Sequence, residues 1–213
     1  MRTSVEMVTS AQALPGRDQA MLIEREHLYF HTPLAMPVPE KCEVAYLALG
    51  CFWGAERKLW QLRGVVSTAV GYQGGFTPNP TYQEVCTGNT GHAEALRVIF
   101  DPEVVTYDGV LQRFFENHDP TQGFGQGADI GTQYRSAIFY VGDTQGEIAR
   151  HVIEVYGEAL HQVGYGLITT EVTRAGPFYM AEEYHQQYLI ANPGGYCGLG
   201  GTGVTCAVGL DLG

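Results

Sequence analysis

The stretch EVAYLALGCFWGAERKLWQL, residues 43–62, decides the fold because a strand pattern passes directly into a helix pattern. The apolar run over residues 43–49 predicts a buried strand that ends at Gly50. Residues 54–62 place apolar and polar side chains at helical spacing, which predicts a short amphipathic helix. The chain therefore leaves the strand and enters the helix through a turn in which Gly50 and Gly54 flank Cys51.

Further patterns extend this unit on the carboxyl-terminal side. Strands are predicted over residues 65–72, 94–100, 136–141 and 166–172, and helices over residues 109–118, 147–163 and 180–191, with one helical turn near 82–86. The central order β-α-β-β-α-β is typical of the ferredoxin-like split βαβ unit. We therefore expect an α+β fold in which helices cover a mixed sheet.

Composition divides the chain into three expected segments. Prolines and glycines punctuate residues 1–40, which we expect to form a long N-terminal extension with a short helix over residues 19–29. Residues 41–193 are expected to form the catalytic domain. Residues 194–213 are rich in glycine and are expected to form a flexible segment that carries two cysteines.

Charge and cysteine content exclude several classes of protein. The chain has 213 residues and a net charge of −11, which argues against nucleic acid as a partner. Its longest apolar run, residues 44–53, is about half of the ~20 residues that a membrane helix needs. Five cysteines are an odd set, unlike a secreted disulfide framework, so we expect a cytoplasmic protein, and we expect it to be monomeric.

Cys51 is the first candidate for chemistry. A cysteine between a strand and a helix faces unpaired backbone N–H groups and the positive end of the helix dipole, which favour a reactive thiolate. Phe52 and Trp53 would line an apolar pocket suited to a thioether-like methyl group. The alternative is a buried structural cysteine, and the glycines on both sides of the turn favour the reactive one.

The glycine-rich tail supplies two more thiols, Cys197 and Cys206. A mobile strap can bring one thiol to several partners in turn, which disulfide exchange requires. The alternative is a disordered terminus with incidental cysteines.

Glu94 and two tyrosines are candidates for proton transfer and hydrogen bonding. Glu94 lies at the start of a predicted strand, where burial would keep its carboxyl group protonated and able to donate. The hydroxyls of Tyr82 and Tyr134 can hydrogen-bond an oxygen without changing charge. The alternatives are a solvated glutamate and tyrosines that only pack.

Five motifs in this order resemble the A-type peptide methionine sulfoxide reductases, over about Ala45 to Cys206. They are Gly50-Cys51-Phe52-Trp53-Gly54, Gly91-His92-Ala93-Glu94, Gly131-Thr132-Gln133-Tyr134-Arg135-Ser136, Glu183-Tyr184-His185-Gln186 and Tyr196-Cys197-Gly198. The long N-terminal arm is similar to that of some bacterial members.

The resemblance implies a role for each candidate residue. Cys51 attacks the sulfur of methionine S-sulfoxide, free or in proteins, and Glu94 protonates the oxygen that Tyr82 and Tyr134 hold. Asp129 supports these groups, and Phe52 and Trp53 bind the S-methyl group.

The resemblance also implies how the enzyme is regenerated. Cys197 then resolves the Cys51 sulfenic acid, and Cys206 relays the disulfide to thioredoxin, with no other cofactor. Cys42 and Cys86 are interpreted as structural, while His185 fits a structural role or a role in the site.

Other functions remain open at this stage. A cysteine hydrolase would pair Cys51 with His92, His118 or His185. A non-catalytic binder of oxidised methionine, or a thiol redox sensor, would need no acid. No cysteine or histidine spacing typical of a zinc site occurs, so we expect no metal.

Overall fold

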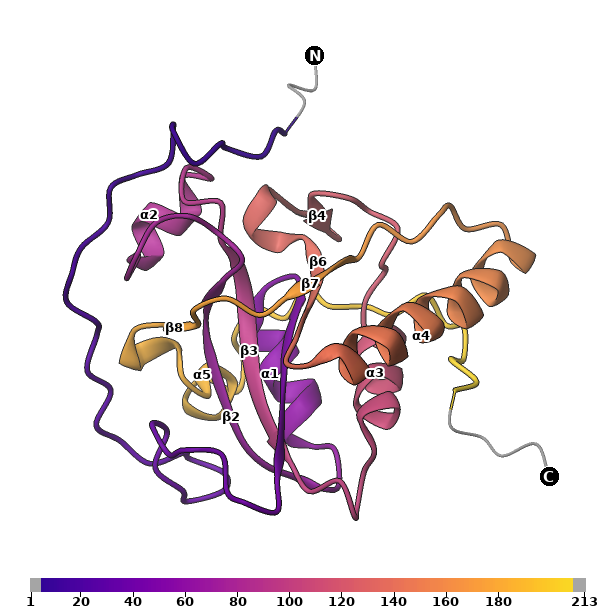
Figure 1. The fold of residues 1–213 in the computed structure, drawn as a ribbon, viewed down its shortest axis with the longest axis horizontal. Helices are drawn as coiled ribbons and strands as arrows, with labels where there is room; N and C mark the ends of the chain where they lie inside the picture. Colours follow the sequence, from indigo (N-terminus) through magenta and orange to yellow (C-terminus); the bar gives the residue numbers. More distant parts are fainter. Residues whose placement is uncertain (1–4, 209–213) are drawn as a thin grey trace.

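A six-stranded sheet forms the centre of the molecule (Figure 1), in a computed structural model that describes residues 5–208. Its strand order is β7-β6-β1-β3-β2-β8. The strands are β1 (Glu43–Leu49), β2 (Val65–Gln73), β3 (Ala93–Phe100), β6 (Ser136–Tyr140), β7 (Glu171–Arg174) and β8 (Tyr179–Met180). Strands β6 and β7 are parallel, and the other neighbours are antiparallel. The order β6-β1-β3-β2 is that of the split βαβ unit, so the expected α+β fold with a mixed sheet is confirmed.

Three helices and the sheet share the main hydrophobic core. The helices of the described chain are α1 (Phe52–Trp60), α2 (Tyr82–Cys86), α3 (Tyr107–Glu116), α4 (Asp143–Gln162) and α5 (Tyr188–Ala191). Two 3₁₀ turns, η1 (Thr132–Tyr134) and η2 (Glu183–His185), and a small hairpin of β4 (Gly125–Gln126) and β5 (Asp129–Ile130) complete the fold. In the part of the chain that the structure describes, no helix combines the length and apolar character needed to cross a membrane.

The core explains why the strands pair in this register. Leu47 on β1 lies opposite Leu96 on β3 and opposite Ile138 on β6, and all three side chains are fully buried. Helices α1, α3 and α4 add side chains to the same cluster, including Phe114 and Tyr156. A one-residue slip would turn these leucines to the other face, so the core fixes the register of β1 and β3.

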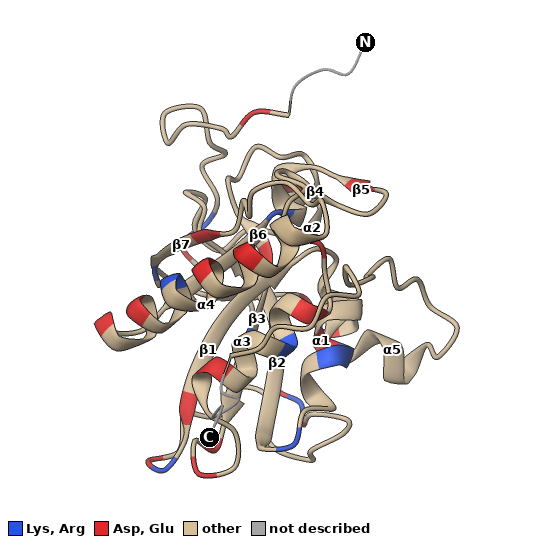
Figure 2. Cartoon of the chain, turned by 90° about the vertical axis from the view of Figure 1, so that its right-hand side faces the viewer, with Lys and Arg blue, Asp and Glu red and all other residues tan. Residues whose placement is uncertain are grey.

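The long helix α4 has one buried side and one exposed side, with residues of each kind at helical spacing. Val152, Tyr156 and Leu160 are buried on one side. The opposite side carries four exposed acidic residues, visible as red segments in Figure 2: Asp143, Glu147, Glu154 and Glu158. This face gives the amphipathic pattern that the sequence predicts.

Three predicted elements differ from the structure. The expected helix over residues 180–191 is wrong: β8, η2 and α5 occupy this stretch, because Gln187 has a left-handed backbone that interrupts a helix. The expected strand over residues 166–172 is displaced to Glu171–Arg174. The expected helix over residues 19–29 is absent: this stretch runs extended and forms a β-bridge between Glu26 and Pro33.

The N-terminal arm does more than extend from the surface. It follows the left side of the view in Figure 1, past α2 and β8. Ile23, His27 and Leu34 are buried, and Ile23 and Leu34 pack with Ala69 of β2. The expected segments 1–40 and 194–213 both reach beyond the described residues, so their boundaries stay a prediction.

Replacing Leu96 by alanine tests the core. The variant Leu96→Ala should lose about 2–5 kcal/mol of unfolding free energy, because a central buried side chain leaves a cavity. Urea unfolding measures this loss. The matched substitution Leu167→Ala removes a side chain that is 88% exposed, and its effect should stay within about 0.5 kcal/mol. Equal effects of the two substitutions would contradict this description of the core.

Candidate active site

Cys51 lies at the tight turn between β1 and α1. Gly50 has a φ of 100°, and a Cβ atom there would come 2.7 Å from the Cβ of Gln126, so both conformation and space require glycine. Cys51 is the N-cap residue of α1. Its sulfur accepts backbone hydrogen bonds from the N–H groups of Trp53 and Gly54, as expected at a helix N-terminus.

The pKa of the Cys51 thiol is raised, whereas the sequence predicted that a helix N-terminus would lower it. Burial is the main cause that raises the pKa of Cys51 to about 12, and the nearby carboxylates of Glu94 and Asp129 raise it further. The two backbone hydrogen bonds lower the pKa, but they do not outweigh burial. The resting sulfur is therefore a thiol with only 8% of its residue surface exposed.

Glu94 lies at the start of β3, opposite Tyr72 in the β2–β3 register. Its carboxyl group is buried, and its Oε2 accepts a hydrogen bond of 2.9 Å from the N–H of Phe52. Burial raises the pKa of Glu94 to about 8, Asp129 raises it as well, and the Phe52 hydrogen bond opposes them. The alternative of a solvated glutamate is therefore wrong, and Glu94 holds a proton at neutral pH beside Cys51.

Two tyrosines and Asp129 reach the site from the loops beyond the sheet. Tyr82 begins α2 and stacks on Phe52, with 6.4 Å between ring centroids. Tyr134 ends η1. Burial raises the pKa of both tyrosines, and the nearby Glu94 raises each pKa further. Both hydroxyls therefore stay neutral, as the sequence predicts, and Asp129 lies close enough to raise the pKa of Tyr134 too.

An aromatic wall surrounds the side chain of Trp53. Its indole Nε1–H donates to Nδ1 of His185 at 3.0 Å, and its ring stacks on Tyr188 with centroids 3.9 Å apart. The ring of Phe52 lies 5.1 Å from that of His185. The sequence left the role of His185 open and missed Tyr188, since neither belongs to a periodic pattern. Only the Glu183-Tyr184-His185-Gln186 motif pointed to this segment.

Glu182 is a second residue that sequence reasoning missed. Its Oε2 accepts a hydrogen bond of 2.7 Å from the Tyr72 hydroxyl, and its Oε1 accepts one of 2.8 Å from the N–H of Tyr82. Glu182 therefore fixes the first turn of α2, which carries Tyr82. Sequence reasoning missed this role because Glu182 follows β8 in a stretch predicted as helix.

The two tail thiols lie in different environments. Cys197 Sγ lies against the first turn of α1, since a Cβ atom on Gly54 would come within 2.8 Å of it. Tyr196, next to it, donates from its hydroxyl to Asp129 Oδ2 at 3.2 Å. Cys206 is fully buried in the core, and its N–H donates to Glu116 Oε1 at 2.9 Å. The structure thus brings Cys197 toward the site and holds Cys206 apart from it.

The remaining cysteines stand outside this group. Cys42 is half-buried just before β1. Cys86 ends α2 and is exposed; burial is the main cause that raises the pKa of the Tyr82 hydroxyl, and Cys86 lies close enough to raise it further. All five cysteines lie in the described residues, and all five are unpaired.

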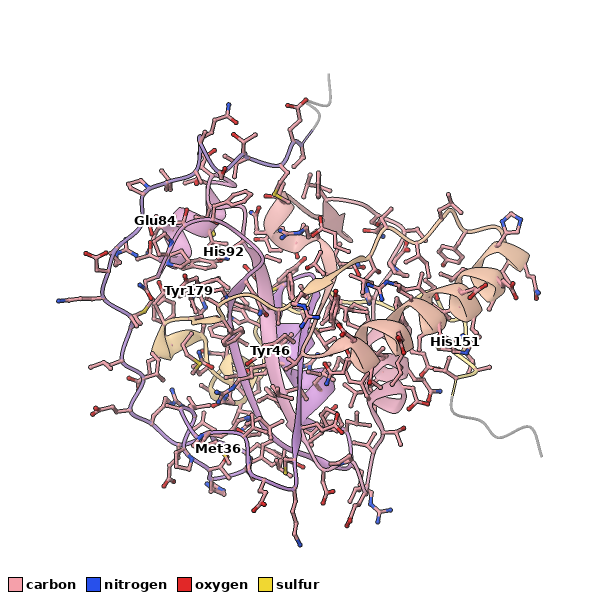
Figure 3. All side chains as sticks on the ribbon, in the orientation of Figure 1. Met36, Tyr46, Glu84, His92, His151 and Tyr179 are labelled. Carbon is pink, nitrogen blue, oxygen red and sulfur yellow. The ribbon has the colours of Figure 1, made fainter. Side chains whose placement is uncertain are left out.

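Two of the three histidines that a hydrolase could pair with Cys51, His92 and His118, have other partners. His92 accepts from the N–H of Gly75 at 3.0 Å and contacts the carbonyl of Thr77 at 2.7 Å; Figure 3 shows it beside Tyr179. The ring nitrogens of His118 contact the carbonyl of Phe114 and the hydroxyl of Ser136. Their ring nitrogens are thus committed to structural contacts.

Comparisons with known proteins agree with this arrangement. The family model for peptide methionine sulfoxide reductase matches residues 43–203. Peptide methionine sulfoxide reductase MsrA 1 of Synechocystis sp. is 55% identical over 206 residues, which cover 97% of this chain and 93% of that protein.

Two solved structures extend the comparison. Methionine sulfoxide reductase A of Corynebacterium diphtheriae has a TM-score of 0.84 at 45% identity, covering 90% of this chain and 93% of that one. Mxr1 from Saccharomyces cerevisiae in complex with Trx2 has a TM-score of 0.50 at 27% identity, covering 72% and 90%. The chain therefore belongs to the A-type peptide methionine sulfoxide reductases, enzymes that reduce methionine S-sulfoxide to methionine.

Proposed function

We propose that Cys51 and Glu94 act together on the sulfur–oxygen bond of a methionine sulfoxide. The hydrogen bond from Phe52 N–H to Glu94 carries this proposal, because it holds a protonated carboxyl group beside the residue that bears the thiol. A sulfoxide oxygen is a poor leaving group until it is protonated. A nucleophile and an acid must therefore reach the same bond, and this turn supplies both.

The reductive step balances in atoms and electrons. Glu94 gives its proton to the sulfoxide oxygen while the Cys51 sulfur bonds to the substrate sulfur. The thiol proton returns to Glu94, directly or through water. The sulfur–oxygen bond and the new sulfur–sulfur bond then break as the hydroxyl group passes to Cys51, which becomes a sulfenic acid, and the thioether of methionine leaves. Cys51 supplies both electrons, so this step needs no other reductant.

The surrounding side chains suit the substrate. Tyr82 and Tyr134 keep their protons and donate hydrogen bonds to the sulfoxide oxygen. The rings of Phe52 and Trp53 form the apolar side that receives the S-methyl group. Asp129 acts through its neighbours: it adds to burial in raising the pKa of Glu94, and it accepts a hydrogen bond from Tyr196.

Regeneration proceeds through the tail. The Cys197 thiol condenses with the Cys51 sulfenic acid, which forms a disulfide and releases water. The thiol of Cys206 then attacks the sulfur of Cys197, which frees Cys51 and leaves a disulfide within the tail. A thioredoxin dithiol reduces that disulfide. The structure of a relative, Mxr1, in complex with Trx2 supports such a partner.

The proposed scheme also leads to expectations about the substrates, cofactor, oligomeric state and cellular location of the protein. All electrons pass through thiols, so the reaction uses no prosthetic group. A monomer suffices for this scheme, since one chain supplies Cys51, Glu94 and both tail cysteines. Five unpaired cysteines support a reducing, cytoplasmic location. Free methionine sulfoxide and protein-bound methionine sulfoxide present the same bond, so both are substrates.

Thiol counting tests the nucleophile and the first resolving cysteine. One equivalent of methionine sulfoxide, added without a reductant, should remove two titratable thiols from the reduced protein and release one methionine per chain. The variant Cys51→Ser should release none, because it lacks the nucleophile. The variant Cys197→Ser should release about one methionine per chain and retain the sulfenic acid, which a dimedone adduct detects by mass spectrometry. Sustained turnover by Cys51→Ser would exclude this role of Cys51.

The variant Glu94→Gln tests the acid. Its single-turnover rate should fall at least about tenfold, since general acid catalysis contributes roughly 10²–10⁴-fold. The acid must hold its proton to act, so the wild-type rate should decline as the pH rises through about 8. The variant should lose this decline. An unchanged rate and pH profile in single-turnover measurements would remove Glu94 from the mechanism.

The variant Cys206→Ser tests the second resolving cysteine. It should complete the first reduction normally and stop with a disulfide between Cys51 and Cys197, because the next thiol is missing. Peptide mapping under non-reducing conditions identifies this disulfide. The variant Cys42→Ser is the control and should turn over normally with thioredoxin. Normal thioredoxin-driven turnover by Cys206→Ser would show that the tail needs only one thiol.

A further inference from the structure

We propose that Glu56 is a positioning residue that fixes the aromatic wall of the active site through Gln187, and that the N-terminal arm completes the network holding Glu56. This inference rests on the proposed function, since the wall at Trp53 is its pocket for the S-methyl group. It gives residues 23–34 of the arm, expected to be peripheral, a part in substrate binding.

Glu56 is a buried carboxylate with no cation among the partners that bind it. It lies on α1, one turn after Phe52, and is fully buried. Its Oε1 accepts from the hydroxyl of Thr68 at 2.9 Å and from the Nε2 of Gln187 at 2.7 Å. Its Oε2 accepts from the N–H of Gln187 at 2.8 Å. A buried acidic group is retained only where such donors compensate its burial.

Gln187 lies in the turn that positions the aromatic wall around Trp53. It lies between His185 and Tyr188, and its φ of 50° makes the turn between η2 and α5. Those two residues hold Trp53, one by accepting its indole hydrogen bond and the other by stacking. Glu56 binds both the backbone and the side chain of Gln187, so it sets where this turn lies relative to α1.

The arm closes the network from the other side. Nδ1 of His27 accepts from the N–H groups of Tyr29 and Phe30, so its proton lies on Nε2 and is donated to the Thr68 hydroxyl at 2.8 Å. The hydroxyl of Thr68 in turn donates to Glu56. The N–H of Leu28 reaches Oε1 of Gln187 at 3.4 Å.

The three donors that face Glu56 fit a carboxylate: burial raises its pKa to about 7, and the hydrogen bonds from Gln187 and Thr68 lower it. Glu56 accepts three hydrogen bonds and donates none. Burial lowers the pKa of His27 to about 4, so the ring is neutral and donates only through Nε2. An amide at position 56 would keep the shape of the side chain, but its NH₂ group would face another donor.

The variant Glu56→Gln is the direct test, with a peptide methionine sulfoxide as substrate. We expect its KM to rise at least about fivefold, while the single-turnover rate at saturating substrate changes less than about twofold. A second readout is the NMR signal of the Trp53 indole N–H, assigned with Trp60→Phe. Its hydrogen bond to His185 should weaken, so its exchange with solvent should accelerate.

Further variants separate positioning from general loss of stability. Thr68→Val removes the bridging hydroxyl and should show the same two effects in weaker form, and Thr68→Ser should restore both. The control Thr77→Val removes another buried hydroxyl that binds the arm, at the Leu14 carbonyl. It should change neither the KM nor the Trp53 signal.

Two outcomes test whether Glu56 is a positioning residue. A raised KM together with faster exchange of the Trp53 indole proton supports a positioning role. A variant Glu56→Gln that lowers only the melting temperature, with unchanged KM and indole signal, overturns it. Activity in Cys51→Ser would instead overturn the proposed function itself, so the two failures are distinguishable.

Discussion

The hydrogen bond from the Phe52 N–H to the Glu94 carboxyl is the constraint on which the site depends. It joins the first residue of α1 to the start of β3. It therefore requires the glycine turn at Gly50, and it requires β1 and β3 to pair in the register that Leu47 and Leu96 fix. The hydrophobic core thus sets the distance between nucleophile and acid, although no core side chain takes part in the chemistry.

Burial has opposite effects on the two reacting groups. It keeps a proton on Glu94, which an acid needs, and it keeps a proton on Cys51, which a nucleophile must lose. The resting pair is therefore neutral, and a site with little water tolerates that state best. In the proposed mechanism Glu94 gives one proton to the substrate oxygen and takes one from the thiol, so charge separation exists only during the reaction. The helix N–H groups at Trp53 and Gly54 are placed to stabilise the developing thiolate of that mechanism.

The sequence predicted the elements whose patterns are local. The apolar run of β1 and the helical spacing of α3 follow from packing against the core, while β3 is buried on both faces and alternates between two hydrophobic clusters. Residues 180–191 have a helical spacing of apolar side chains, yet Gln187 adopts a left-handed backbone because Glu56 binds both its N–H and its side chain. That tertiary contact outweighs local propensity, and a pattern within one segment cannot reveal it. The predicted direction of the Cys51 pKa shift was wrong for the same reason. Burial by residues distant in the sequence raises the pKa more than the local helix N-terminus lowers it.

The two tail cysteines that we propose for regeneration lie in different places. Cys197 lies against the helix that carries Cys51, so the proposed first disulfide needs little motion. Cys206 belongs to the core that α3 and α4 share, where Tyr156 and Tyr165 also bind Thr202. The proposed exchange requires the two Cα atoms to approach within roughly 4.4–6.8 Å, so Cys206 has to reach Cys197 from a buried position. The glycines between them allow a change of backbone, and burial raises the pKa of Cys206 to about 11, so its thiol stays protonated while it is buried.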